Sequence, residues 1–292
     1  MARNRMTLWT LAAAGTMLAL KATGRGQRTS TWPVNQMRPL DIGPLSIGTG
    51  RPKIIVSSSG AQEASVLQDA RTIANAREAD LMELRVDKLD FATDAPRVAK
   101  LGGEVSRALD GKPLLLTFRT KQEGGVRAIS DTAYTELYRH WIDAGFAGLI
   151  DIEMMRGDDH VRTLVNHARA AGIPVILSSH DFQKTPSDKE MLARLAKQRA
   201  LGADVLKLAV MPRSAGDVLR LLKVTDQTRR QGHVPLLTMA MGGLGTISRL
   251  SGETFGSSLT FGSLGQGSAP GQIDAGVLRH VLDALHQAHK VN

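Results

Sequence analysis

The segment Asp204–Pro212, DVLKLAVMP, decides the fold class because it is typical of a fully buried strand. Its aliphatic residues follow one another, whereas a strand with one wet face alternates apolar and polar residues. Continuous apolar strands belong to parallel sheets that other elements cover on both faces. Lys207 is the one charged residue inside the aliphatic run, and the remaining sequence has to explain it.

A lysine in such a strand has two interpretations. Loss of water disfavours the ammonium form, and a neutral amine attacks ketones and aldehydes, so Lys207 is a candidate Schiff-base nucleophile. Alternatively, only the aliphatic stem lies along the core and the charged head reaches solvent. Lysine is rarely buried without a partner or a task, so the neighbouring residues decide between the two.

Eight segments of strand character alternate with helical segments along the chain. The predicted strands are Lys53–Ser58, Leu81–Asp87, Pro113–Thr120, Gly148–Met154, Pro174–Asp181, Asp204–Val210, Pro235–Met241 and Ser257–Ser263. Helical patterns of 10 to 17 residues separate them, among them Thr132–Ala144, Asp188–Leu201, Ala215–Arg229 and, last, Ile273–His289. This alternation predicts an α/β fold, a (β/α)₈ TIM barrel formed as a single domain over residues 38–292.

Two details complete the predicted fold. Residues 38–51 contain two brief segments around Gly43 and Pro44 and predict a short hairpin ahead of the barrel. A doubly wound open sheet is the alternative architecture, but no glycine-rich dinucleotide-binding motif follows the first strand.

Composition excludes several classes of function. The chain of 292 residues is 42% hydrophobic and 22% charged, which is ordinary for a globular protein, and it has no cysteine. Thiol catalysis, disulfides and cysteine-based metal sites are therefore excluded. The net charge is +9, and residues 1–37 carry five basic residues and no acid. Acids and bases alternate in the remainder without a basic stripe, so nucleic acid is not an expected partner.

The N-terminal segment has the pattern of an export signal. Arg3 and Arg5 precede the apolar run 8–20, LWTLAAAGTMLAL. As a helix this run spans about 20 Å, less than the roughly 30 Å hydrocarbon core of a bilayer. We expect residues 1–23 to be a signal peptide or signal anchor with transient membrane contact through residues 6–23, and residues 24–37 to be a linker. Export to the periplasm is predicted; a misassigned start codon before a cytoplasmic enzyme is the alternative.

Charged residues gather at the predicted strand ends, where a barrel places its active site. They are Glu83, Arg85 and Asp87 on one face of the second strand, Arg119 at the end of the third and Glu123 in the loop after it, Asp151 and Glu153 on the fourth, His180 at the end of the fifth and Arg249 after the seventh. Singly, each has a structural explanation, such as a helix cap, an ion pair or a supporting contact. The loop Gly262–Gln272 is a plain surface loop, a phosphate-binding loop or a mobile lid.

Seven motifs occur together and in order at these strand ends: PKIIVS, ELRVDKL, LLLTFRTKQEGG, SSHDFQKTP, DVLKLAVMP, ISRL and SAPGQI. With them the chain resembles the type I 3-dehydroquinate dehydratases, Schiff-base enzymes built on a (β/α)₈ barrel. The resemblance runs from about Pro52 to His289. A single motif such as HDF would be weak, whereas the ordered set is specific.

The resemblance implies a mechanism position by position. Lys207 would form an imine with the C3 ketone of 3-dehydroquinate, which makes the C2 proton removable. His180 would take that proton and then protonate the departing C1 hydroxyl, and imidazole suits both steps. Glu123 would orient His180. The product would be 3-dehydroshikimate, and neither a metal nor an organic cofactor is implied.

The resemblance also implies substrate contacts. Arg249 would pair with the substrate carboxylate, for which a planar guanidinium gives two parallel hydrogen bonds. The other implied contacts to hydroxyls and carboxylate are Glu83, Arg85, Arg119, Ser268 and Gln272, with Met239 and Met241 as apolar walls. The family further suggests a homodimer.

Other interpretations of the sequence remain open. Another Schiff-base barrel lyase or aldolase would need a phosphate site after the last strands, and a non-catalytic binding barrel would not need the lysine and histidine. Biosynthetic and catabolic roles are also both open. An exported enzyme would suit quinate catabolism outside the cytoplasm, whereas biosynthetic members of the family work in the cytosol.

Overall fold

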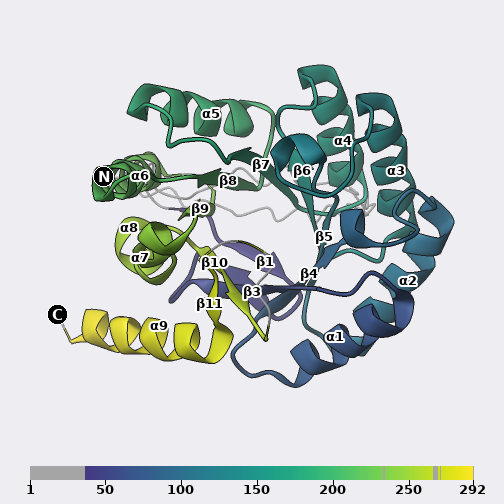
Figure 1. The fold of residues 1–292 in the computed structure, drawn as a ribbon, viewed down its shortest axis with the longest axis horizontal. Helices are drawn as coiled ribbons and strands as arrows, with labels where there is room; N and C mark the ends of the chain where they lie inside the picture. The colour runs from purple at the N-terminus through teal and green to yellow at the C-terminus, as the bar shows by residue number, and fades with distance from the viewer. Residues whose placement is uncertain (1–36, 233, 266–268, 270, 292) are drawn as a thin grey trace, which may run out of the picture. The chain divides into compact units, whose positions relative to one another are not determined.

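The computed structural model describes residues 37–291 except 233, 266–268 and 270, and a parallel sheet organises this part of the chain (Figure 1). Its strands are β3 (Lys53–Ser57), β4 (Leu81–Arg85), β5 (Leu114–Thr117), β6 (Leu149–Glu153), β7 (Val175–Asp181), β8 (Val205–Val210), β9 (Leu236–Ala240), β10 (Leu259–Ser263) and β11 (Ile273–Asp274). The order is β11-β10-β3-β4-β5-β6-β7-β8-β9, and all neighbours pair in parallel.

The sheet curls until its last strands meet. β10 pairs with β3, so the eighth strand of the predicted series lies beside the first. On the other side of β10, the amide of Ser258 donates to Leu236 O at 2.7 Å, and a parallel bridge joins Leu236 to Ser257. The eight strands β3 to β10 therefore form the predicted (β/α)₈ barrel.

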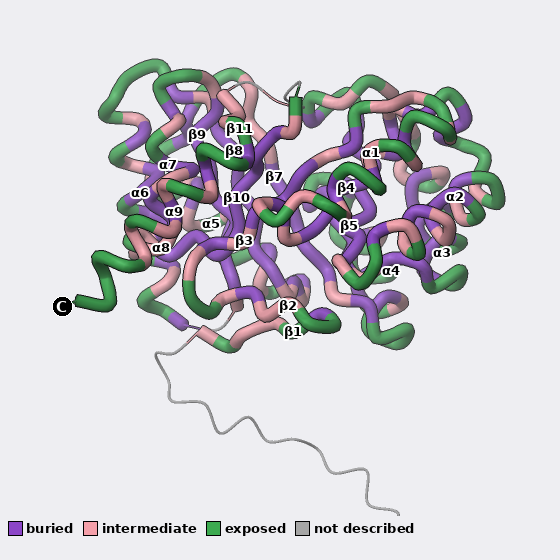
Figure 2. The backbone as a smooth tube through the Cα atoms, turned by 90° about the horizontal axis from the view of Figure 1, so that it is seen from below, coloured by how far each residue is buried: buried purple, intermediate pink, exposed green. Residues whose placement is uncertain are grey.

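Helices surround these strands on the outside (Figure 1). They are α1 (Glu63–Asn75), α2 (Ala95–Ala108), α3 (Asp131–Ala144), α4 (Asp158–Ala170), α5 (Asp188–Ala200), α6 (Ala215–Arg230), α7 (Thr246–Leu250), α8 (Gly252–Phe255) and α9 (Ala275–Lys290). Figure 2 shows the strands almost wholly buried, with exposed residues concentrated on the helices and loops. Among the described residues, no helix combines the length and apolar composition needed to cross a membrane.

A hairpin fills one end of the barrel. β1 (Leu40–Ile42) and β2 (Leu45–Ile47) pair antiparallel, and their Ile42 and Ile47 belong to the apolar cluster inside the barrel. The other members at this end come from the first residues of strands, such as Leu81 and Leu149. The amino ends of the strands are thus sealed by apolar packing, and the carboxyl ends remain for a site.

The structure corrects three sequence-based boundaries. The last helix was expected over Ile273–His289, but Ile273–Asp274 form β11 beside β10 and the helix begins at Ala275. The Asp274 side chain accepts from the amides of Gly276 and Val277, which is an N-cap and explains the start. Between β9 and β10 no helix reaches 10 residues, because five glycines between 242 and 256 leave only short helical turns.

The third correction concerns Asp87, which was expected on the same strand as Glu83 and Arg85. β4 ends at Arg85, and Asp87 lies in the 3₁₀ turn Val86–Lys88 that follows. Residues 1–36, which hold the predicted signal segment and nearly all of the predicted linker, lie outside the described residues, as does Ser268.

Candidate active site

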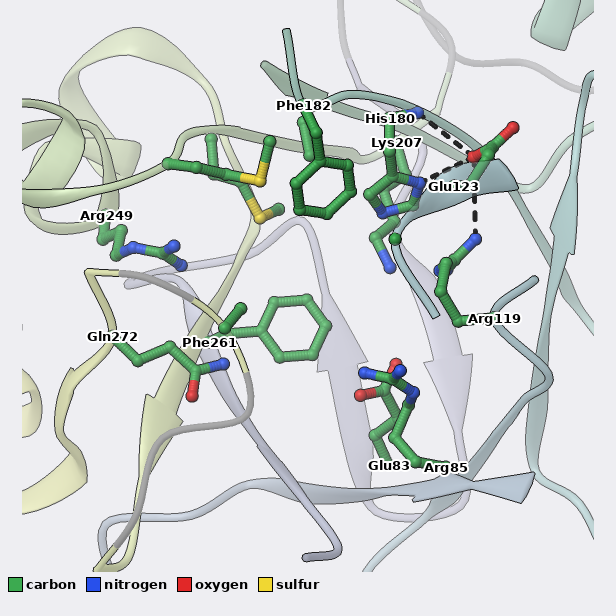
Figure 3. A pocket seen from close by; sticks show the side chains of 15 residues that line it. Glu83, Arg85, Arg119, Glu123, His180, Phe182, Lys207, Arg249, Phe261 and Gln272 are labelled. Carbon is green, nitrogen blue, oxygen red and sulfur yellow. Dashed lines mark hydrogen bonds and ion pairs between the residues drawn. The ribbon is translucent and has the colours of Figure 1, made fainter. Parts of the chain in front are cut away.

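A pocket opens at the carboxyl ends of the strands and gathers the predicted site residues (Figure 3). Of the nine, all eight that the structure describes line it: Glu83, Arg85, Arg119, Glu123, His180, Lys207, Arg249 and Gln272. Met239 and Met241 line it as well. In Figure 3, Arg249 and Gln272 lie across this space from Glu123 and Arg119.

Lys207 projects into the pocket from the middle of β8. It is 3% exposed, so its head does not reach bulk solvent as the snorkelling interpretation required. Its Nζ lies 2.6 Å from Asp151 Oδ2 and 5.0 Å from the centre of the Phe261 ring. Because Asp151 is fully buried, the two groups form an ion pair shielded from water. Sequence reasoning anticipated a supporting role for Asp151 without identifying this contact.

Arg119 lines the pocket beside this pair and contacts two buried carboxylates behind it, Asp151 and Glu153, and we call these three residues the floor. The guanidinium of Arg119 lies 3.0 Å from Glu153 Oε1 and 2.9 Å from Asp151 Oδ1. Ser178 accepts a hydrogen bond from Arg119 NH1 and donates to Asp151 Oδ1. Burial alone would raise the pKa of Asp151, but the cations Arg119 and Lys207 outweigh it and hold that pKa below its ordinary value. Asp151 is therefore ionised and is the counter-ion of both Arg119 and Lys207.

His180 is held by Glu123 from two directions. Glu123 Oε2 lies 2.8 Å from His180 Nδ1 and also accepts from the backbone amide of His180 at 3.1 Å. Burial, followed by the charges of Arg119 and Lys207, holds the pKa of His180 well below its ordinary 6.5. Burial, with the Glu153 carboxylate next, raises the pKa of Glu123 from 4.5 to about 8. The two groups titrate as a pair that keeps one proton at neutral pH.

A polar wall comes from β4. Glu83 accepts hydrogen bonds from Ser57 Oγ and from Thr117 Oγ1, the latter at 2.9 Å. Arg85 binds Asp87 through two parallel contacts of 2.8 and 2.9 Å. Asp87 does not line the pocket, so its contribution is to hold the guanidinium of Arg85 in one orientation.

The opposite wall joins a cation to apolar side chains. Arg249, from α7, is 2% exposed, and burial lowers its pKa from 12.5 to about 10. A guanidinium that lines a pocket can bind a carboxylate through two parallel hydrogen bonds. The surrounding side chains of Met239, Met241 and Phe261 are apolar.

Several lining residues were not predicted: Gly124, Phe182, Ala209, Phe261 and Ala269. Phe182 stacks on His180 with the planes 17° apart, and its position directly after the SHD strand end was an available signal. Phe261 lies on β10, whose carboxyl end a barrel also directs toward the site. In the described part of the chain, no cluster of three or more His, Cys, Asp or Glu is arranged to hold a metal ion.

Comparison with known proteins agrees with this geometry. The family model described as Type I 3-dehydroquinase matches residues 54–289. The 3-dehydroquinate dehydratase of Salmonella typhimurium is 43% identical over 253 residues, which cover 86% of this chain and all of that protein.

Solved structures give the same result. The type I 3-dehydroquinate dehydratase of Clostridium difficile, solved with covalently modified comenic acid, superposes with a TM-score of 0.84 at 39% identity and covers 87% of this chain and 100% of its own. The 3-dehydroquinate dehydratase of Enterococcus faecalis has a TM-score of 0.79 at 40% identity, covering 84% and 99%. The chain belongs to the type I 3-dehydroquinase family.

Proposed function

We propose that the protein is a 3-dehydroquinate dehydratase that converts 3-dehydroquinate to 3-dehydroshikimate through an imine on Lys207. The observation that carries the proposal is the meeting of Lys207 with the His180–Glu123 pair in one pocket, beside a floor that balances charge around Nζ. Its family relatives carry this name, and the pocket holds a lysine, a histidine and a carboxyl group of the kinds that the proposed reaction uses.

The first step forms an imine between Lys207 and the C3 carbonyl, starting from the ammonium that is paired with Asp151. The ammonium gives up a proton so that its nitrogen can attack the carbonyl carbon, two of its three protons leave with the carbonyl oxygen as water, and the protonated imine keeps the positive charge at the position of Nζ. Asp151, at 2.6 Å from Nζ, is the counter-ion before and after this step. The protonated imine withdraws electrons and makes the proton on C2 acidic.

The second step is elimination by His180. With its Nδ1–H donating to Glu123, the imidazole presents Nε2 as the base that takes the C2 proton. The C2–H electrons form the C1–C2 double bond through the imine, and the imidazolium returns the proton to the leaving C1 hydroxyl as water. Hydrolysis of the imine consumes the water released first, so the net loss is one water.

Substrate binding is assigned to the two walls. Arg249 would pair with the carboxylate, and the polar groups of Glu83, Arg85, Arg119 and Gln272 would bind hydroxyls and carboxylate, together with Ser268. An aldolase acting on sugar phosphates is not favoured, since the described residues that line the pocket with Arg249 include the apolar Met239, Met241 and Phe261.

Borohydride trapping tests the mechanism. The protein is incubated with 3-dehydroquinate and borohydride, and the adduct is located by intact mass and peptide mapping. We expect a substrate-derived adduct on Lys207 and none in Lys207→Ala. His180→Ala should still form the adduct while product formation fails. An active, folded sample that gives no adduct would sink the imine mechanism.

For location, we propose export through residues 1–23, followed by quinate catabolism in the periplasm. The support is the basic start with Arg3 and Arg5 and the apolar run of residues 8–20. Fractionation of cells that express the full chain, with N-terminal sequencing, is the test. Cytosolic protein with an intact N-terminus would remove this proposal and leave the catalytic one untouched.

We also propose a homodimer, on the family resemblance alone. Light scattering during size-exclusion chromatography measures the mass directly. A mass near the 31.4 kDa of one chain at micromolar concentration would contradict it.

A further inference from the structure

A buried glutamine occupies a core position of α5. The helix turns Met191, Leu195 and Gln198 toward the barrel, at spacings of four and three residues that follow one helix face. Two of these positions hold apolar side chains, and the third holds an amide that is 0% exposed. Burying an amide costs free energy unless it finds hydrogen-bond partners. Its partners therefore explain why a glutamine stands where an apolar residue would pack.

Both partners belong to Lys207. Gln198 Nε2 donates to Lys207 O at 2.8 Å, and Gln198 Oε1 accepts from Lys207 N at 3.0 Å. The two bonds form a closed pair like those between neighbouring strands, with a side chain of α5 in place of a strand. The amide holds the main chain of β8 from outside the barrel at the residue whose side chain points into the pocket.

We propose that Gln198 is a positioning residue that fixes the backbone of Lys207 so that Nζ lies within reach of the substrate carbonyl. The inference rests on the proposed role of Lys207 as the imine-forming residue. A lysine side chain has four rotatable bonds, and its Nζ is held at the far end by Asp151. Gln198 fixes the backbone at the near end, so the position of Nζ is restrained at both ends of the lysine side chain.

The same arrangement recurs beside the other charged residues of the pocket floor. From α3, Tyr138 accepts from the amide of Phe118 and donates to the carbonyl of Asp151. Tyr134 accepts from the amide of Glu153 at 3.2 Å. Helix side chains thus hold the strand backbone from outside at Asp151, Glu153 and Lys207. Holding catalytic groups through supporting contacts is how a rigid site keeps reactive geometry.

The test is Gln198→Met, which keeps the length and volume of the side chain and removes both hydrogen bonds. We expect kcat to fall by about tenfold or more, because misplacement by about 1 Å can cost about 100-fold in rate. The KM should stay within about twofold, since the carboxylate and hydroxyl contacts are untouched. The rate of borohydride-trapped adduct formation should fall by the same factor as kcat.

Thr225→Val is the matched control. Thr225 on α6 is equally buried, and its hydroxyl shares a hydrogen bond of 2.8 Å with Thr238 on β9, so it also joins a helix to a strand. This variant should lose stability without a change in kcat or trapping rate below its unfolding temperature. A folded Gln198→Met protein with kcat and trapping rate within about twofold of the unaltered enzyme would overturn the inference.

A second variant covers failure to fold. Gln198→Asn keeps the amide but withdraws it by about 1.5 Å, one carbon–carbon bond. It should show the same coupled loss of kcat and trapping rate, and unchanged rates in it would also overturn the inference. The proposed function fails differently, because the unaltered enzyme would then give no adduct on Lys207 at all.

Discussion

Lys207 and Arg119 are two buried cations whose charges are balanced inside the protein. Asp151 contacts both, and Glu153 contacts Arg119. A buried ion pair seldom stabilises a fold more than packed apolar side chains would, so stability does not explain such a group. The proposed catalysis does, because the positive charge at Nζ persists when the ammonium becomes a protonated imine. The carboxylates of the floor are therefore already in place to stabilise the positive charge that the reaction keeps there.

The Glu123–His180 pair makes stability depend on pH. In the unfolded chain the two groups titrate at 4.5 and 6.5, whereas the folded pair keeps one proton up to about pH 8. Between pH 6.5 and 8 the folded state binds more protons, so the free energy of unfolding falls as pH rises. The expected loss is about 2 kcal/mol across this window, at 1.36 kcal/mol per pH unit.

Glu123→Gln isolates the effect. Only His180 then titrates, and its lowered pKa gives stability that is present above pH 6.5 and lost below it. Urea unfolding of both proteins from pH 6 to 8.5 should therefore show the variant gaining about 2 kcal/mol relative to the unaltered protein. Parallel curves across this range would contradict a shared proton.

Arg249 is expected to act on substrate binding. Arg249→Ala should raise KM by about tenfold or more and reduce kcat less, because a buried charge-assisted contact contributes about 1.5–3 kcal/mol. Steady-state kinetics with 3-dehydroquinate measure both constants. Arg213→Ala is the control, since Arg213 is exposed and does not line the pocket. An unchanged KM in Arg249→Ala would remove its assignment as the carboxylate partner.

At the scale of elements, the turn after β5 determines where Glu123 lies. Glu123 ends the short 3₁₀ turn Lys121–Glu123, and Gly124 follows with φ at 84°, a left-handed conformation that favours glycine. Gly125 then packs directly on the backbone, and its amide donates to Thr120 O at 2.8 Å. The turn therefore depends on two consecutive glycines for two different reasons.

Gly125→Ala tests the turn without removing a charged group. The added Cβ would lie 1.9 Å from Arg119 O, which is backbone and cannot move aside cheaply, and it would also lie 3.0 Å from Asp87 Oδ2. We expect a loss of about 1–3 kcal/mol in the free energy of unfolding and a fall in kcat as Glu123 moves from His180. Denaturant unfolding and steady-state kinetics measure the two effects.

Gly103→Ala is the matched control for this change. Gly103 lies inside α2, and its nearest neighbour to a new Cβ is the flexible end of Arg107 at 3.7 Å. Alanine should stabilise this helix by about 0.5–1 kcal/mol and leave kcat unchanged. Equal kcat in Gly125→Ala and the unaltered enzyme would show that the turn does not govern Glu123.

At the scale of the whole molecule, the sequence predicts the barrel because its signals are local. Each apolar run and each amphipathic helix can be recognised in a short window, and the strand ends carry the charges. Contacts across strands are not local. Asp151 and Lys207 come from β6 and β8, with β7 between them, so the sequence shows a charged residue on each but not that they meet.

Tertiary context also explains the remaining differences. Ile273–Asp274 continue a helical pattern, yet β10 offers them a strand partner, and Asp274 becomes a cap. Gln198 interrupts an apolar helix face, a signal that was present but whose meaning depends on Lys207 lying beside it. Periodicity in the sequence predicts which face of a helix or strand is buried. Which residues then contact one another depends on which of these faces meet in the fold.

Closure of the barrel depends on contacts between β9 and β10, and a substitution of Ser257 tests one of these contacts. The Ser257 hydroxyl accepts from the amide of Thr238 on β9 at 3.1 Å and donates to Leu259 O on β10 at 3.0 Å. Ser257→Ala leaves the Thr238 amide buried and unpaired, which should cost about 1–3 kcal/mol in the free energy of unfolding.

Ser258→Ala is the neighbouring control, because its hydroxyl contacts the weak acceptor Met37 Sδ, and it should cost less. Neither serine lines the catalytic pocket, so kcat well below the unfolding temperature should stay unchanged in both. Equal stability losses in the two variants would mean that closure between β9 and β10 rests on the backbone bond of Ser258 to Leu236 and not on the Ser257 hydroxyl.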